Sequence, residues 1–237
     1  MPLTALTAWE TLFDRLDLSP DGEDAGTPVL LINGAGGVGS MAIQLARVAG
    51  LKVIATASRP ESRQWCFDLG ADEVVDHFGD LPAQLAERGL DSIPAIACFN
   101  DLDRHYPAMA QLVAPQGRLA SIVGNKKPLP FQELREKSVG LFWECMFTRP
   151  RFDNPEKGRQ GEILDAVIGM VDDGRLVSTR SQGLGTISAE NLRTAHRLLS
   201  SLMHCRAEAR PTAGGGFLMQ TAVGWTLVQR RFVGFKV

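Results

Sequence analysis

The sequence lacks an excess of charge of either sign, and it lacks long apolar runs. Its 237 residues include 25 lysines and arginines against 27 aspartates and glutamates, for a formal net charge of −2. A chain so balanced has no electrostatic footprint for nucleic acid or for an anionic membrane surface. No apolar stretch is long enough to span a bilayer, and no basic segment opens the chain as in a secretory signal peptide. These absences predict a soluble cytoplasmic protein without nucleic-acid or membrane partners.

Closely spaced cysteines are also absent, which argues against a disulfide framework and against a zinc site. The four cysteines are Cys66, Cys98, Cys145 and Cys205, and none forms a Cys-x-x-Cys pair or a Cys/His cluster. Cys98 and Cys145 lie in apolar runs, so we expect both as buried thiols in a reducing compartment. The four histidines form no metal pair either and are expected at the surface or at helix ends. We expect no bound metal.

A glycine-rich segment is the most informative feature that is present. An apolar run at 29–33 leads directly into G-x-G-x-x-G, and a helix-like stretch at 37–49 follows. In this context the first glycine permits a tight turn, the second lets the backbone approach a pyrophosphate, and the third lets the helix pack against the strand. The N-terminus of the helix then offers free N–H groups to the phosphates. A glycine-rich turn without a ligand is the alternative. The expected cofactor contacts here are Gly34, Gly36, Gly37, Val38 and Gly39.

The residues after the second apolar run indicate which dinucleotide binds. NAD-binding units carry an acidic residue near the end of this strand, where it accepts hydrogen bonds from the ribose 2′-OH. This chain has Ser58 and Arg59 instead, and Arg59 lies twenty residues past Gly39. A guanidinium binds a 2′-phosphate through charge-assisted bonds, so NADP(H) is favoured over NAD(H). Arg63 is one helical turn further and could add to the site. The alternative is that Arg59 and Arg63 are solvated residues at the start of a helix.

Strand-like and helix-like patterns alternate along most of the chain. Such alternation predicts right-handed crossovers and a parallel sheet with helices on both faces. We predict an α/β fold, a doubly wound parallel six-stranded Rossmann sheet in the order 3-2-1-4-5-6. The expected strands are 29–33, 52–57, 73–76, 93–99, 118–123 and 138–147, with a turn at 115–117. The expected helices are 3–16, 37–49, 61–69, 81–88, 103–113, 156–171 and 188–200.

Two strand ends supply further candidate cofactor contacts. Val123, Gly124 and Asn125 end the fifth strand beside the place where a nicotinamide ring would lie, and backbone groups there could bond its carboxamide. A simple turn at the strand end is the alternative. Asn100, just past the fourth strand, is a weaker candidate.

Several segments together resemble the medium-chain dehydrogenase/reductase superfamily, and most closely its zinc-type alcohol dehydrogenase-like and quinone oxidoreductase-like branch. They occur in the family's order at 3–10 (LTALTAWE), 33–40 (NGAGGVGS), 55–62 (ATASRPES), 69–72 (LGAD), 142–144 (FWE), 146–149 (MFTR) and 183–187 (GLGTI). The resemblance covers about residues 2–199. It implies an NADPH-dependent oxidoreductase that transfers a hydride to a carbonyl, quinone or enone substrate without zinc.

The resemblance also implies how the chain divides. Family members carry an N-terminal GroES-like domain that supplies most of the substrate pocket, and we expect this chain to be the cofactor-binding part without that domain. We expect an NADP-binding domain at 1–174 and, at 175–200, a return segment that is a remnant of the GroES-like domain. Residues 201–237 depart from the family pattern and are expected as an atypical, disordered tail, for which a shifted or readthrough reading frame is one hypothesis.

The last expected strand predicts a homodimer. Residues 138–147 form an apolar segment, which would be an aggregation hazard as an exposed sheet edge. In the family this strand pairs with its copy across a twofold axis, so we expect a homodimer through it. The alternative is that the strand packs under the helix at 156–171.

Three functions remain open. The first is the oxidoreductase, for which the sequence identifies no catalytic residue. The second is an NADP(H)-binding module or truncated fragment without turnover. The third is a Rossmann-like methyltransferase, against which the residues after the second strand argue. A short-chain dehydrogenase is disfavoured, because Tyr106 is the only tyrosine and Ala110 stands where that class has lysine.

Overall fold

The computed structural model describes residues 2–153, 155, 156, 158–180 and 183–208, and it divides the chain into two compact units, 1–180 and 181–237. The second unit contains helix α9 (Ala189–Glu208). This helix begins as expected, because the Ser188 hydroxyl accepts the Asn191 N–H at 3.1 Å and so caps its N-terminus. It continues past the expected end at residue 200. The predicted tail begins inside α9, and its residues 209–237 lie outside the described residues. The domain boundaries expected at 174 and 200 stay predictions.

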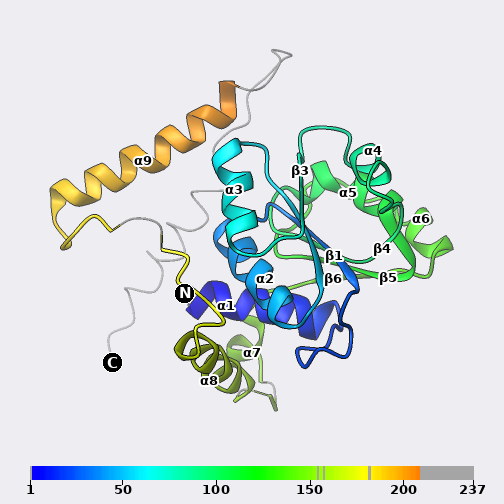
Figure 1. The fold of residues 1–237 in the computed structure, drawn as a ribbon, viewed down its shortest axis with the longest axis horizontal. Helices are drawn as coiled ribbons and strands as arrows, with labels where there is room; N and C mark the ends of the chain where they lie inside the picture. The colour runs from blue at the N-terminus through cyan, green and yellow to red at the C-terminus, as the bar shows by residue number, and fades with distance from the viewer. Residues whose placement is uncertain (1, 154, 157, 181–182, 209–237) are drawn as a thin grey trace. The chain divides into compact units, whose positions relative to one another are not determined.

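The first unit is built on a six-stranded parallel sheet in the order β3-β2-β1-β4-β5-β6 (Figure 1). This order is the predicted one, so the doubly wound α/β fold is confirmed. After β3 the chain crosses to the other side of β1 and continues with β4, so β1 lies between β2 and β4 in the middle of the sheet. The strands are β1 (Pro28–Ile32), β2 (Lys52–Thr56), β3 (Glu73–Val75), β4 (Ile93–Cys98), β5 (Val113–Ser121) and β6 (Gly140–Trp143).

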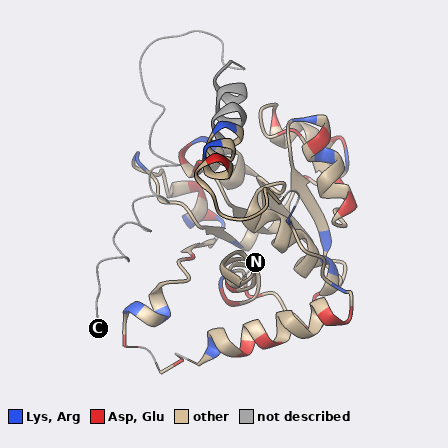
Figure 2. Ribbon diagram, turned by 90° about the vertical axis from the view of Figure 1, so that its left-hand side faces the viewer, with Lys and Arg blue, Asp and Glu red and all other residues tan. Residues whose placement is uncertain are grey.

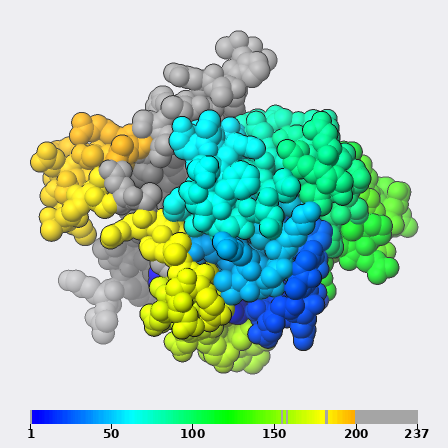
Figure 3. Space-filling model, viewed as in Figure 1, coloured from blue at the N-terminus to red at the C-terminus, as the bar shows by residue number. Residues whose placement is uncertain are grey.

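Helices cover both faces of the sheet. Buried side chains on one face come from α1 (Pro2–Trp9), η1 (Glu10–Arg15), α2 (Gly37–Val48), α3 (Pro60–Asp68) and α8 (Arg159–Asp172). The other face is covered by α4 (Leu81–Ala86), α5 (Leu102–Leu112) and α6 (Gln132–Glu136). Figure 3 shows the outer surface of the first face, where α3 lies beside α2.

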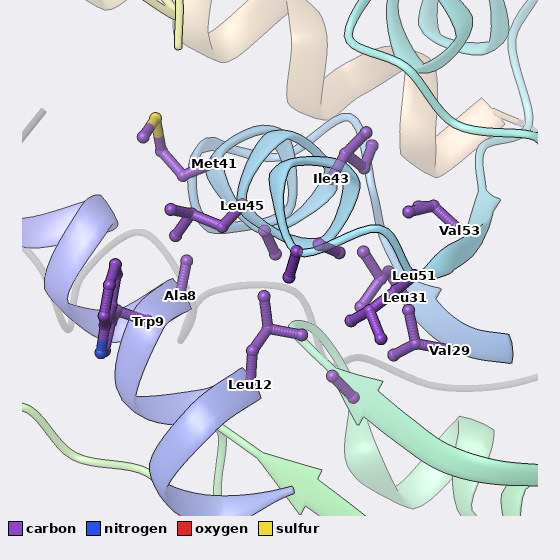
Figure 4. Close-up of a cluster of buried hydrophobic side chains, with 14 of the residues drawn as sticks. Ala8, Trp9, Leu12, Val29, Leu31, Met41, Ile43, Leu45, Leu51 and Val53 are labelled. Atoms are coloured by element: carbon purple, nitrogen blue, oxygen red, sulfur yellow. The ribbon is translucent and has the colours of Figure 1, made fainter. Parts of the chain in front are cut away.

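The largest core cluster lies between the sheet and the first set of helices. The buried side chains come from alternate positions of the strands, as Val29 and Leu31 of β1 illustrate. Figure 4 shows them beneath α2, with the first helix of the chain alongside. The residues labelled there are Ala8, Trp9, Leu12, Val29, Leu31, Met41, Ile43, Leu45, Leu51 and Val53. Parallel strands buried on both faces require near-continuous apolar runs, and that is the pattern from which they were predicted.

Two expected elements differ in the structure. The expected turn at 115–117 is a bulge inside β5, since Val113 pairs with Ile93 of β4 whereas Arg118 pairs with Ala95. Gln116 has a φ of 62° there, and its N–H donates to a carbonyl outside the strand pair. The sixth strand has four residues and not the ten expected at 138–147. After it the Glu144 N–H still bonds β5, at the Ser121 carbonyl, and the chain then turns between Cys145 and Thr148.

The first expected helix changes its winding part-way. It is α-helical as far as Trp9 and continues as the π-helical segment η1, in which the Leu16 N–H donates to the Thr11 carbonyl at 3.0 Å. Two short helices were not predicted, α6 and α7 (Thr148–Arg151). Both have fewer than six residues, so neither shows a helical repeat of apolar positions.

An ion cluster joins η1 to the segment after β6. Arg149 pairs with Glu10, which is buried, and with Asp14 at 2.8 Å. The buried Glu144 pairs with Arg15 at 2.7 Å. Burial and the neighbouring Glu10 raise the pKa of Glu144 to about 7. Elsewhere on the first unit acidic and basic residues are interspersed, as Figure 2 shows.

The cysteines follow the sequence prediction only in part. Cys66 and Cys98 are buried thiols, and burial raises the pKa of Cys66 to about 11 and that of Cys98 to about 12. Cys145, expected in the core, is exposed because it follows the last residue pairing with β5 and lies in the turn toward α7. The prediction for Cys145 was therefore wrong.

Candidate dinucleotide site

The glycine-rich turn follows β1 and leads into α2. Asn33 begins it in the left-handed conformation, with a φ of 69°. The Gly36 N–H then donates to the Asn33 carbonyl at 3.1 Å, and the Ser40 N–H donates to the Gly36 carbonyl at 2.8 Å. These bonds close the turn and start the helix within the eight residues 33–40.

Two glycines of the motif are required by packing inside the protein. A Cβ at Gly39 would lie 2.4 Å from the Asn33 carbonyl oxygen and 2.5 Å from the Gly34 carbonyl oxygen. A Cβ at Gly34 would lie 2.8 Å from the Cβ of Ala55 in β2. Their role is to bring α2 close to the end of β1, which is the role that the motif assigns to its outer glycines.

The N-terminus of α2 is open to a ligand. Gly36 precedes the helix in an extended conformation and has no side chain to cap it. The first N–H groups of a helix have no partner within the helix, so those of Gly37 and Val38 are available to an anion. Gly37 is exposed, and a Cβ on it would touch only the Thr4 Cγ2, at 3.4 Å. These residues fit the pyrophosphate of a dinucleotide.

Ser58 and Arg59 follow β2 at the same edge of the sheet. Arg59 is exposed at the start of α3, and its guanidinium makes one weak bond among the described residues, to the Ser62 hydroxyl at 3.4 Å. Arg63 lies differently. Its guanidinium donates to the Val74 carbonyl at 2.7 Å and to the Ala57 carbonyl at 3.4 Å, so it ties the ends of β2 and β3 together.

The ends of β4 and β5 bring the remaining candidates to this edge. The Asn100 carbonyl accepts the Cys98 thiol at 3.1 Å. Val123, Gly124 and Asn125 begin the loop after β5, and Gly124 and Asn125 are exposed. The Ser121 hydroxyl donates to the Val123 carbonyl at 2.9 Å and accepts the Val123 N–H at 3.2 Å.

Asp103 of α5 holds the loop after β5 in place. Its carboxylate accepts the Lys126 N–H at 2.8 Å and the Lys127 N–H at 3.1 Å. These backbone bonds hold the pKa of Asp103 below its ordinary value. The loop that would meet a nicotinamide ring is thus anchored from α5.

Sequence reasoning missed two residues that support the turn. Thr56 accepts the Asn33 N–H on its hydroxyl at 2.9 Å, and this hydroxyl also bonds His77 Nδ1 at 3.1 Å. His105 of α5 was expected at the surface or at a helix end, but it is buried, with its ring centroid 5.9 Å from that of His77. The alternation of β2 and β3 with helices does not reveal that these residues meet.

The part of the chain that the structure describes contains no set of side chains that could bind a zinc ion. None of its groups of three or more His, Cys, Asp or Glu residues could hold a metal. The same residues contain no helix that is both long enough and apolar enough to cross a membrane.

Residues 37–149 match the family described as zinc-binding dehydrogenase. A zinc-type alcohol dehydrogenase-like protein of Staphylococcus aureus (strain MSSA476) is 40% identical over 200 residues, which are 84% of this chain and 60% of that protein. The chain therefore spans about 60% of the length of this relative. A solved structure from Rhizobium etli CFN 42, described as a zinc-dependent alcohol dehydrogenase, is also 40% identical, with a TM-score of 0.77 over 92% of this chain and 63% of that one.

A more distant structure shares the fold. A protein of Vibrio vulnificus, solved in complex with NADPH, is 21% identical with a TM-score of 0.59, over 75% of this chain and 53% of that one. At this identity the similarity concerns the fold alone.

Proposed function

Because the chain belongs to the medium-chain dehydrogenase/reductase superfamily, in its zinc-type alcohol dehydrogenase-like branch, we propose that it binds NADP(H) and serves hydride transfer to a carbonyl, quinone or enone. One observation carries the cofactor choice. Arg59 is exposed at the carboxyl end of β2, with no acidic residue between that strand and α3. An acid there would repel a 2′-phosphate, whereas a guanidinium binds it.

Each part of the site has a definite task in this proposal. The N–H groups of Gly37 and Val38 bind the pyrophosphate at the N-terminus of α2. Ser58 and Arg59 bind the 2′-phosphate, and backbone groups of residues 123–125 orient the nicotinamide carboxamide, with Asn100 alongside. The bound nicotinamide supplies the hydride chemistry, and the protein positions it.

A binding module without turnover is the second candidate. It is favoured by one observation: among the described residues, the carboxyl edge of the sheet holds cofactor-binding groups but no side chain that we can assign as an acid or base toward a substrate. A steady-state assay of NADPH oxidation with a panel of carbonyls, quinones and enones separates the two. Oxidation above the rate without substrate supports the enzyme, and binding without oxidation supports the module.

We also propose that the protein is a homodimer formed through β6. This strand is the last of the sheet and pairs on one side with β5, and its Trp143 is 45% exposed. An unpaired apolar edge favours association. Sedimentation velocity of the wild type and of Trp143→Lys is the test, with the exposed Phe78→Lys as control. A monomeric wild type would contradict the proposal.

We propose the cytoplasm as the location of the protein. The exposed free thiol of Cys145 fits a reducing compartment of this kind.

The first experiment for the cofactor is calorimetric titration with NADPH and with NADH. Charge-assisted bonds contribute about 1.5–3 kcal/mol each, so losing one raises the Kd by roughly 10- to 150-fold. Arg59→Ala should therefore weaken NADPH binding by at least tenfold and leave NADH binding nearly unchanged. Arg135→Ala, an exposed arginine of α6, is the matched control and should change neither.

Three results would count against the cofactor proposal. Equal affinity of the wild type for both dinucleotides would remove the 2′-phosphate assignment. An unchanged NADPH affinity in Arg59→Ala would remove Arg59 from the site. Binding of neither dinucleotide would leave the glycine-rich turn as a feature of the fold alone.

A further inference from the structure

Thr56 holds the glycine-rich turn through two consecutive bonds. Its hydroxyl accepts the N–H of Asn33 at 2.9 Å, and its backbone carbonyl accepts the N–H of Gly34 at 3.0 Å. Thr56 is the last residue of β2 and is fully buried, so both bonds are shielded from water. The position of the turn therefore depends on a residue of the neighbouring strand.

His77 completes the hydrogen bonding of the Thr56 hydroxyl. The ring nitrogen Nδ1 lies 3.1 Å from Thr56 Oγ1. A threonine hydroxyl has a single hydrogen to donate. The oxygen accepts the Asn33 N–H and keeps a second lone pair, so whether its hydrogen is directed to His77 Nδ1 depends on the ring tautomer. A neutral ring with its hydrogen on Nε2 accepts that hydrogen at Nδ1.

The surroundings of His77 contain further basic groups. From α5, the His105 ring meets it edge-on with centroids 5.9 Å apart, and Arg104 lies 4.4 Å from the centroid of the Phe78 ring. Burial, His77 and Arg104 lower the pKa of His105 to about 4. Arg63 of α3 lies at the ends of β2 and β3, where it binds two carbonyls.

Acidic groups flank the same elements, and three of them, Asp76, Asp80 and Asp103, accept backbone N–H groups. Asp76 and Asp80 precede α4 and accept the backbone N–H groups of Phe78 at 2.9 Å and of Ala83 at 3.0 Å. Asp101 precedes α5 and Asp103 lies in its first turn, where Asp103 binds the loop after β5. Both histidines line an open cavity of about 290 Å³ between the β3–α4 loop and α5, through which solvent protons reach the rings.

We propose that His77 is a positioning residue for the dinucleotide site: neutral His77 accepts the Thr56 hydroxyl hydrogen and so stabilises the turn, and a proton taken from solvent onto Nδ1 removes that acceptor and weakens dinucleotide binding. The inference rests on the proposed cofactor function. It concerns a bond between β2 and the β3–α4 loop, and no contact of His77 with the dinucleotide is needed. Histidine is the side chain that changes charge between pH 5 and 8.

The test is calorimetric titration with NADPH between pH 5.5 and 8.5. The phosphate of the ligand itself titrates near pH 6, so the readout is the difference between proteins and not the pH dependence of one protein. His77→Asn keeps an acceptor at the position of Nδ1 but cannot be charged. We expect the wild type to lose about tenfold in affinity toward pH 5.5 relative to His77→Asn, and the two to agree at pH 8.5. His196→Asn, an exposed histidine of α9, should behave as the wild type.

A second variant tests whether the effect passes through the hydroxyl. In a Thr56→Val background, adding His77→Asn should no longer change the pH dependence. If Thr56→Val does not fold, ring-proton NMR of His77 with and without NADPH in the wild type replaces it. NADPH should then lower the pH midpoint of the His77 signal.

Each other result overturns a defined part of the argument. Equal pH dependence of the wild type and His77→Asn removes His77 from the site. Stronger binding by the wild type at low pH means that the charged ring attracts the phosphates directly, which contradicts the positioning role. Failure of the wild type to bind either NADPH or NADH at any pH removes the proposed function itself, and the inference with it.

Discussion

Replacing Gly39 by alanine should destabilise the protein more than any other single methyl group added at the glycine-rich turn. The new Cβ would lie 2.4 and 2.5 Å from the carbonyl oxygens of Asn33 and Gly34, and 2.7 Å from the Gly34 Cα. Carbon–oxygen contacts of about 3.3 Å are the ordinary limit, so α2 or the turn must move by almost 1 Å. Overpacking costs about 1–3 kcal/mol. Because the neighbouring atoms here belong to the backbone and cannot rotate away, we expect a loss near 3 kcal/mol.

Thermal unfolding followed by circular dichroism measures the effect. For a unit of this size 1 kcal/mol corresponds to about 2–4 °C, so Gly39→Ala should lower Tm by about 6–12 °C. The matched control is Gly169→Ala in the exposed interior of α8, where an added Cβ meets nothing within 4 Å. That change should raise stability by about 0.5–1 kcal/mol, because alanine favours the helix. A Tm of Gly39→Ala within 2 °C of the wild type would refute the packing argument.

Gly36→Ala separates packing from ligand approach at the same turn. Its Cβ would meet the Asn33 side-chain amide at 2.8 Å, and this amide is the end of a side chain that can rotate away. We expect a loss in Tm below about 3 °C, in line with 1 kcal/mol or less. The same methyl group would occupy the space through which the backbone approaches a pyrophosphate. NADPH affinity should therefore fall although the fold persists.

Three further predictions concern the ion cluster and the thiols. Folding raises the pKa of Glu144 to about 7, so this carboxyl stabilises the fold at low pH and the contribution is lost as pH rises through 7. Urea unfolding should therefore show the free energy of unfolding falling from pH 5 to 8. Glu144→Gln should reduce this fall by on the order of 1–3 kcal/mol. Arg149→Met leaves the buried Glu10 without its ion pair and should cost about 3–5 kcal/mol in the same assay at pH 7, and a loss below 1 kcal/mol would contradict the buried pairing. Under native conditions a maleimide should modify Cys145 and spare Cys66, as read by peptide mass spectrometry; rapid labelling of Cys66 would contradict its burial.

The fold was predictable wherever local sequence dictates geometry. The unit of β1, turn and α2 follows from an apolar run and from glycines at fixed offsets, and both packing glycines have the close contacts that the motif assigns to them. The strand order follows from the alternation of elements, because right-handed crossovers leave few arrangements of a parallel sheet. The helix boundaries shifted by one to three residues at most positions in the first unit.

The misses have a common cause, which is dependence on residues distant in the sequence. Cys145 lies in an apolar run, but β6 ends two residues earlier and leaves it in an exposed turn. The bond between Thr56 and His77 joins residues 21 positions apart, and it exists because β2 and β3 pair in one register. Pattern reasoning gives the existence of two strands and not the residues that meet across their ends.

Arg59 and Arg63 show how far this dependence reaches into the site. They are one helical turn apart, so the sequence makes both candidates for the same phosphate. In the structure the Arg63 guanidinium donates to two carbonyls at the ends of β2 and β3. Arg59 is exposed and donates weakly to the Ser62 hydroxyl. Arg63→Ala should therefore cost about 1.5–3 kcal/mol of folding stability, the loss of a charge-assisted bond. Arg59→Ala should leave stability within about 0.5 kcal/mol, as for a surface residue, and act on NADPH affinity. Measuring Tm and Kd for both variants decides the assignment: if Arg63→Ala weakens NADPH binding as much as Arg59→Ala while leaving Tm unchanged, both guanidinium groups belong to the phosphate.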